Sequence, residues 1–343
     1  MSSQIVGTAA RQRVGRSLAS IFIMAISVGP LAPPAVSQDI PPLVQVKKLL
    51  DLGGFSENRF GLAVALSSDG RTALVGARGD HSLGLHSAGA AHVYRRIQGE
   101  WVQEAKLFAP QPIIEGFFGV SIALSANGDL ALVGASSFFA FCGEPICGGS
   151  AYFFQRDPQG GWHLIQTLMS AGGGLTDAFG ASVALSGSGT VAAIGARRAG
   201  CPLGDPCGAM FVFVRRQGEW QLEDRLEPQV PDPFVGEFGT AVSLSRSGKT
   251  VLIGAVGSAF VFSREGQEWT EQAKLQEPGL SFAGSVALSG NGRIALVGSN
   301  GAAFGYRREQ GEWSGGQLLP TGTLGVTDVA VAISRSGDRA LLG

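Results

Sequence analysis

The sequence is poor in charged residues and in histidine, cysteine and tyrosine. Asp, Glu, Lys and Arg make up 15% of the 343 residues, and the chain has only 4 His, 4 Cys and 3 Tyr. Hydrophobic residues, at 45%, are too many for a disordered chain, and 52 Gly are too many for a helical bundle. This composition predicts many short strands joined by tight turns, in one large domain or two average ones.

The sequence also lacks the motifs of common enzymes. It has no Gly-x-Ser-x-Gly elbow, no His-Glu-x-x-His and no phosphate-binding glycine loop before a helix. No paired carboxylates recur at a position where they would line a common pocket. The strands that we expect to lie innermost in the fold, which are of the Ala-Val-Ala-Leu-Ser type described below, offer only Ala, Val, Leu and Ser. No basic cluster is present, so nucleic acid is not an expected partner. We therefore do not expect an enzyme.

The first 37 residues have the pattern of a secretory signal peptide. A basic stretch with Arg11, Arg13 and Arg16 precedes an apolar run at 18–28, and small residues at 35–37 predict cleavage near Ser37 and Gln38. The alternative is an N-terminal membrane anchor, although the run is short for a span. No other stretch is long and apolar enough to cross a bilayer. The mature chain would carry 23 basic and 27 acidic residues, a net charge of −4.

An internal repeat dominates the rest of the chain. The segment that begins at Phe60 recurs at Phe118, Phe179, Phe238 and Phe282, with a weaker sixth copy at Thr327. The copies are 44 to 61 residues apart, a spacing that fits a propeller blade better than a helical repeat. We expect the repeat array to occupy residues 38–343.

Each unit is expected to form four strands, here called A to D in chain order. Strand A is of the Ala-Val-Ala-Leu-Ser type, and an Asp-Gly or Asn-Gly turn leads to strand B, of the Ala-Leu-Val-Gly-Ala type. Strand C is aromatic and β-branched. Strand D opens with tryptophan in every unit, which uses all five Trp of the chain: Trp101, Trp162, Trp220, Trp269 and Trp313. The interpretation is that each Trp packs between neighbouring blades.

The two ends of the array predict how the ring closes. Residues 44–49 have the pattern of a strand D with no strands before them, so the N-terminal strand is expected to pair into the last blade. The sixth unit stops midway through its strand B. We therefore expect this sequence to be part of a longer protein with six or seven blades.

In these features the units resemble FG-GAP repeats, the blades of the integrin α-subunit head and of many bacterial exported proteins. Phe-Gly pairs begin four units, at 60, 118, 179 and 238, and decay to Phe282-Ala283 in the fifth. Gly-Ala pairs end strand B at 76, 134, 195 and 254, with Gly298-Ser299 in the fifth, while the proline of the family pattern is replaced throughout. The resemblance implies an all-β fold, a β-propeller of four-stranded blades.

The calcium sites common in this family are not expected here. Such a site needs several oxygen ligands in the loop between strands A and B. In this chain those loops are short and hold at most one acidic residue each. No cofactor and no metal ion are therefore predicted.

The loops between strands B and C contain all four cysteines. In an exported protein, local pairs predict the disulfides Cys142–Cys147 and Cys201–Cys207. A zinc site built from all four is the alternative, but their spacings are irregular.

The same B–C loops hold the candidate binding residues. Phe138, Phe139 and Phe141 place three aromatics in one loop, as an exposed partner-binding patch or tucked beneath it. Arg78-Gly79-Asp80 spells the cell-adhesion tripeptide that integrins recognise, in a loop expected to be exposed, although such short matches arise by chance. Asp80, His81 and His86 could hold a metal, but a solvated loop is the favoured interpretation.

The function expected from these observations is a monomeric, non-catalytic, secreted, periplasmic or cell-surface propeller that binds a protein or glycan ligand through its long B–C loops. Two alternatives remain: a propeller hydrolase or lyase acting on a polysaccharide, and a purely structural segment of a larger surface protein.

Overall fold

The computed structural model of the chain describes residues 24–27, 47–49, 57–81, 83–137, 148–170, 177–200, 208–229, 236–277, 283–319 and 329–343. Within these ranges the regular structure consists of strands joined by turns, with no α-helix. The predicted all-β class is confirmed.

Five units form four-stranded antiparallel sheets in which each strand pairs with the next along the chain. Blade 1 contains β2 (Phe60–Leu66), β3 (Thr72–Ala77), β4 (Ala90–Ile97) and β5 (Glu100–Leu107). Blade 2 contains β6 (Phe118–Leu124), β7 (Leu130–Ala135), β8 (Ser150–Arg156) and β9 (Trp162–Met169). Blade 3 contains β10 (Phe179–Leu185), β11 (Val191–Ala196), β12 (Ala209–Arg216) and β13 (Glu219–Leu226).

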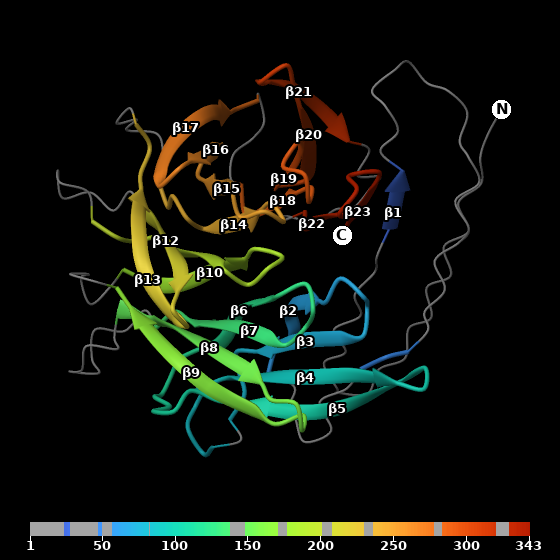
Figure 1. Cartoon of the computed structure of the whole chain (residues 1–343), viewed down its shortest axis with the longest axis vertical. Coiled ribbons are helices and arrows are strands. Elements are labelled where there is room, and N and C mark those ends of the chain that lie inside the picture. The colour runs from blue at the N-terminus through green and yellow to red at the C-terminus, as the bar shows by residue number, and fades with distance from the viewer. Residues whose placement is uncertain are drawn as a thin grey trace.

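The next two blades have a shorter strand A. Blade 4 contains β14 (Ala241–Leu244), β15 (Thr250–Ala255), β16 (Ser258–Glu265) and β17 (Glu268–Leu275). Blade 5 contains β18 (Ser285–Leu288), β19 (Ile294–Ser299), β20 (Ala302–Glu309) and β21 (Glu312–Leu319). The sheets surround a common centre, with the A strands innermost and the D strands outermost (Figure 1). This is the architecture of a β-propeller.

The sixth sheet differs from the other five. It has three strands in the order β1 (Met24–Ser27), β23 (Arg339–Leu342) and β22 (Val331–Ile333), so β1 lies where a strand C would be. The prediction that residues 44–49 pair into the last blade is wrong for residues 47–49, which form no strand. The physical reason is that a strand D pairs with a strand C, and the described part of the sixth unit supplies only β22 and β23, which correspond to strands A and B.

Leu49 nevertheless occupies a place that its sequence pattern suggested. It packs against the cluster of Ala73, Val75 and Tyr94 in blade 1. Leu107, at the end of strand D in blade 1, lies in the same way in one cluster with Phe118, Ala131 and Val133 of blade 2. The Lys-Leu pattern therefore marks a contact with the following blade, and that contact forms here without strand pairing.

The hydrophobic core lies between successive blades. Strand B is fully buried in four of the blades, and most of strand C is buried with it, whereas strand D is largely exposed. The predicted interblade packing of tryptophan is confirmed: Trp220 of blade 3 stacks on Phe153 of blade 2 with ring centroids 4.2 Å apart, and Trp269 of blade 4 packs with Met210 of blade 3. The tryptophans of blades 2 to 5 thus join the outer part of one sheet to the sheet before it, whereas Trp101 packs against residues of its own blade.

The turns between strands A and B are joined to one another around the ring. Backbone hydrogen bonds link six successive turns, from Ser68 to Ala126, Gly187, Arg246, Gly290 and Arg335, each N–H donating to the next carbonyl at 2.9–3.0 Å. The inner rim at this end of the propeller is therefore held by backbone alone, independent of which side chains the turns carry.

Candidate functional site

The face that carries the B–C connections is the one on which the blades differ most. Blades 1, 2 and 3 have connections of 12 to 14 residues, at 78–89, 136–149 and 197–208, whereas blades 4 and 5 reverse direction in two residues, Val256-Gly257 and Asn300-Gly301. In an antiparallel four-stranded blade the B–C and D–A connections leave at the same end. The long loops and the D–A connections therefore form one rim, which we call the B–C rim.

Each long loop is anchored to the following blade by a glycine at its end, which pairs with the phenylalanine of the next Phe-Gly pair. Gly89, Gly149 and Gly208 form parallel bridges with Phe118, Phe179 and Phe238. The Phe-Gly glycines have positive φ, as at Gly239 (φ 91°), where an added Cβ would lie 2.7 Å from the Ala209 carbonyl. The Gly-Ala glycine is equally crowded: a Cβ on Gly195 would overlap the Gly239 carbonyl oxygen. The family motif is thus the joint between blades, and it fixes where each loop begins and ends.

The joint also explains why the Phe-Gly pair is lost in unit 5. Blade 4 uses Val256 and Gly257 to reverse the chain, so no loop residue remains to bridge to the next blade. Ala283 then takes the place of glycine, and its carbonyl still approaches Gly254.

The residue that replaces the proline of the family pattern reaches the next blade. The Arg78 guanidinium lies 5.8 Å from the centre of the Phe117 ring, and Arg197 Nη1 donates to Glu237 Oε2 at 3.1 Å. Phe117 and Glu237 each come directly before a Phe-Gly pair. Burial lowers the pKa of Arg78, and the positive charges of Arg59 and Arg197 lower it further. Three arginines, one of them paired with Glu237, therefore lie close enough on this rim for their charges to interact.

The tripeptide Arg78-Gly79-Asp80 is not displayed as expected. The Asp80 side chain is only 1% exposed and accepts a hydrogen bond from Lys106 Nζ at 2.9 Å. Gly79 is pressed against the backbone of residues 57 and 58. The expected exposure of this loop is wrong for these residues, because Asp80 lies at a buried corner that Ala199 occupies in blade 3. Its carboxylate neutralises a lysine within the fold.

A different acid joins the two histidines of this loop. Glu57, His81 and His86 each offer a ligand atom, and these atoms lie within 4.8 Å of one another. The rings of His81 and His86 meet edge to face with centroids 4.7 Å apart, and Glu115 Oε1 lies 3.9 Å from His86 Nδ1. The sequence pattern groups the histidines with Asp80 and gives no sign of either glutamate, because both lie far away in the sequence and carry no motif.

The remaining predicted site residues lie outside the described residues. These are Phe138, Phe139, Phe141, Cys142, Cys147, Cys201 and Cys207. The aromatic patch and the two disulfides stay predictions from the sequence.

The A–B turns, at the opposite end, have a donor set that does not fit calcium. Their polar oxygens are used within the turn: Asp69 Oδ1 accepts hydrogen bonds from Ser67 Oγ and the Arg71 N–H, and Asn127 Oδ1 accepts one from Ser125 Oγ at 2.7 Å. At most two carboxylate or amide side chains per turn are too few for a six- to eight-oxygen shell.

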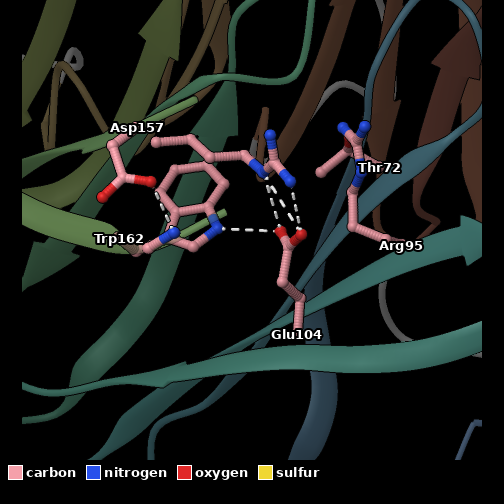
Figure 2. Close-up of polar contacts among 7 residues, drawn as sticks. Thr72, Arg95, Glu104, Asp157 and Trp162 are labelled. Atoms are coloured by element: carbon pink, nitrogen blue, oxygen red, sulfur yellow. Dashed lines mark hydrogen bonds and ion pairs between the residues drawn. The ribbon is translucent and has the colours of Figure 1, made fainter. Parts of the chain in front are cut away.

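A polar contact between outer strands was also missed by the sequence. Every described strand D has a bulge three residues after its tryptophan, and in blades 1, 3 and 4 the side chain at the bulge contacts the next blade. In blade 1 the bulge residue is Glu104, which accepts hydrogen bonds from Arg156 Nη2 at 2.7 Å and Trp162 Nε1 at 3.0 Å in blade 2 (Figure 2). Glu223 binds Arg264 and Trp269 in the same way between blades 3 and 4.

Comparison with known proteins agrees with this architecture. Residues 43–94 match the FG-GAP repeat family. A chain of the mitotic checkpoint complex is 12% identical over 81% of this chain and 75% of its own, with a TM-score of 0.53. A functionally unknown protein from Desulfotomaculum acetoxidans DSM 771 is 15% identical over 76% of this chain and 74% of its own, with a TM-score of 0.49. No curated protein matches the sequence.

The repeat match, the Phe-Gly and Gly-Ala joints and the ring of sheets lead to one conclusion. The chain is a β-propeller of four-stranded blades, and its residues 43–94 match the FG-GAP repeat family. Because the sequence identity is only 12%, the likeness to the chain of the mitotic checkpoint complex concerns the fold alone. Among the described residues, none forms a helix with the length and hydrophobicity of a membrane span.

Proposed function

We propose that this propeller is an exported, non-catalytic binding module whose ligand contacts the B–C rim. The observation that carries the proposal is the uneven distribution of loop length: three successive long loops, each bridged to the next blade, lie on one face, while blades 4 and 5 contribute only two-residue turns. Extra residues held on a rigid scaffold are where binding sites are commonly built. A purely structural ring would have no need of them on one side.

The rim residues suggest the first ligands to examine. Arg59 and Arg197 lie close enough to Arg78 that their positive charges lower the pKa of Arg78. A bound anionic group would offset this repulsion between the guanidinium groups. Acidic polysaccharides are therefore suitable first probes, followed by extracellular proteins. The predicted aromatic patch of Phe138, Phe139 and Phe141 would add stacking surface beside this charge.

Export fits the predicted signal peptide of residues 1–37 and the predicted disulfides in the loops of blades 2 and 3. Each disulfide would stabilise its short loop by roughly 2 kcal/mol. Cleavage near Ser37 would remove β1, so the mature sixth sheet would retain β22 and β23 from this sequence. N-terminal sequencing of the secreted protein and titration of its free thiols test these points.

The binding proposal is tested on an array of acidic polysaccharides and extracellular proteins. Wild type is compared with a Phe138→Ser, Phe139→Ser double variant. The matched control is Leu164→Ser with Leu222→Ser, which removes two exposed apolar side chains from outer strands. We expect saturable binding that the loop variant loses and the control retains. Equal binding by both variants would move the site away from this loop.

The same experiment separates the alternatives. Shortening of a bound polysaccharide, measured as new reducing ends or unsaturated products, would favour a hydrolase or lyase. The described A strands carry no acidic, basic or histidine side chain for such chemistry. No binding by the wild type to any probe would favour the purely structural alternative.

A further inference from the structure

We propose that Glu57, His81 and His86 form a zinc site at the edge of the B–C rim, with Glu115 positioning His86. The three ligand atoms already lie within 4.8 Å of one another. A tetrahedral Zn²⁺ with bonds of about 2 Å holds its ligands about 3.3 Å apart. Glu57 and His86 are exposed and His81 is half-buried, so rotation of the two exposed side chains is the movement that would bring the ligand atoms together.

The backbone of all three contributing segments is fixed by hydrogen bonds. The Gly79 N–H donates to the Asn58 carbonyl at 3.0 Å, which holds the loop against the segment that carries Glu57. The Gly84 N–H donates to the His81 carbonyl at 2.8 Å and closes a turn after the first histidine. The site is therefore built on a preorganised frame, as metal binding requires.

The second histidine is tied directly to the following blade. The Glu115 N–H donates to the His86 carbonyl at 2.8 Å, and Phe118 donates to Ala88 two residues further on at 3.0 Å. This pairing also places Glu115 Oε1 3.9 Å from His86 Nδ1. A carboxylate beside one ring nitrogen orients a histidine so that its other nitrogen faces the metal.

The types of ligand in this cluster favour zinc over calcium. Two imidazoles and one carboxylate are the ligands of open zinc sites, whereas Ca²⁺ takes oxygen ligands alone. Glu57 and Glu115 together supply two negative charges that a divalent ion neutralises. His86 is 62% exposed at its side chain, so the fourth position faces solvent and is filled by water or by a group from outside.

The inference does not depend on the ligand proposed above, because the probe is the metal ion alone. Full-length secreted protein without a polyhistidine tag is stripped with chelator, and its thiols are shown to be oxidised so that cysteines cannot bind the ion. Zn²⁺ binding is measured by isothermal titration, with Ca²⁺ as the competing ion. We expect one Zn²⁺ per chain, a rise in melting temperature on binding, and no displacement by Ca²⁺.

The variants locate the ion. His86→Ala removes an exposed ligand, so it should leave the fold intact and weaken Zn²⁺ binding by at least about 100-fold, while Glu115→Gln should weaken it by about tenfold. His163→Ala is the matched control, because His163 is also an exposed histidine beside a carboxylate. Its Nε2 atom lies 2.6 Å from Asp157 Oδ2 on blade 2. Equal affinity in wild type and His86→Ala, or loss of binding in His163→Ala, would overturn the proposal. An unchanged affinity in Glu115→Gln would overturn the positioning role of Glu115.

Discussion

Replacing Glu104 tests whether the blades are fastened by polar contacts as well as by hydrophobic packing. Its carboxylate accepts hydrogen bonds from Arg156 Nη2 at 2.7 Å, from Arg156 Nε at 3.1 Å and from Trp162 Nε1 at 3.0 Å, and both donor residues belong to the next blade. The side chains of Glu104 and Arg156 are only 17% and 20% exposed. Glu104→Ala removes all of these contacts at once and leaves Arg156 and the indole N–H without this acceptor.

The expected loss follows from the number and the burial of these bonds. Hydrogen bonds to charged groups contribute about 1.5–3 kcal/mol each, but partial exposure and non-additivity reduce the total, so we expect Glu104→Ala to lower the free energy of unfolding by about 2–3 kcal/mol. A double-mutant cycle with Arg156→Ala should give a coupling energy of about 1–2 kcal/mol, above the median for exposed pairs.

The pH dependence provides a second measurement on the same pair. Burial opposes ionisation of Glu104, but hydrogen bonds from Arg156 and Trp162 outweigh it and hold the pKa of Glu104 below its ordinary value. Because the folded pKa is lower than the unfolded one, the stabilisation is fully present above the unfolded pKa of about 4.3 and is lost as the pH falls toward the folded pKa. The difference between wild type and Glu104→Gln should therefore shrink below about pH 4.

Urea unfolding followed by tryptophan fluorescence measures both effects. The matched control is Ile165→Ala at the equivalent bulge of blade 2, where the side chain is 40% exposed and a change below about 1 kcal/mol is expected. A loss of less than about 0.5 kcal/mol for Glu104→Ala, with no coupling to Arg156, would refute the reasoning, since that is the behaviour of a surface ion pair.

Two further predictions concern glycine and turns. Gly195→Ala should destabilise the ring by about 3 kcal/mol or more, because its Cβ overlaps a backbone oxygen of the next blade. Gly200→Ala should be nearly neutral, because no described residue lies within 4 Å of the added Cβ. Similar melting temperatures for the two variants would contradict the joint described here. Gln217→Asn should raise stability by about 0.5 kcal/mol, because φ is +53° at this first position of a two-residue hairpin turn and asparagine is preferred there; thermal unfolding that shows no rise would contradict that assignment.

Much of the fold follows from the repeat in the sequence. Alternating apolar residues, Asp-Gly and Asn-Gly turns and a tryptophan in one register were enough to predict four strands per unit and interblade packing, because these signals are local and recur. What escaped prediction depends on contacts between units. The Glu104 contact uses a bulge, and a bulge shows only when the register of two paired strands is known. A glutamate follows Trp101 and Trp220 at the same distance of three residues, and this recurrence is a signal that could have suggested the contact.

The candidate site was harder to predict for the same reason. The sequence predicts an exposed Asp80 because it lies in a long loop, yet its neighbours Asn58 and Lys106 come from other segments and bury it. Glu57 and Glu115 could not be joined to the histidines, because 24 and 29 residues separate them from His81 and His86 in the sequence. Only the folded ring brings these segments together.

The joint between blades has a consequence for engineering this architecture. Each long loop is closed by the Phe-Gly pair of the following unit, so the transferable module is not a blade but a loop together with the first two residues of its neighbour. A graft of the blade 1 loop onto blade 4 should therefore also change Ala283 to glycine. Conversely, the first two residues of a unit in this chain indicate whether the B–C connection before it is long or short. A designer can therefore infer from the sequence alone which blades carry long loops on the B–C rim.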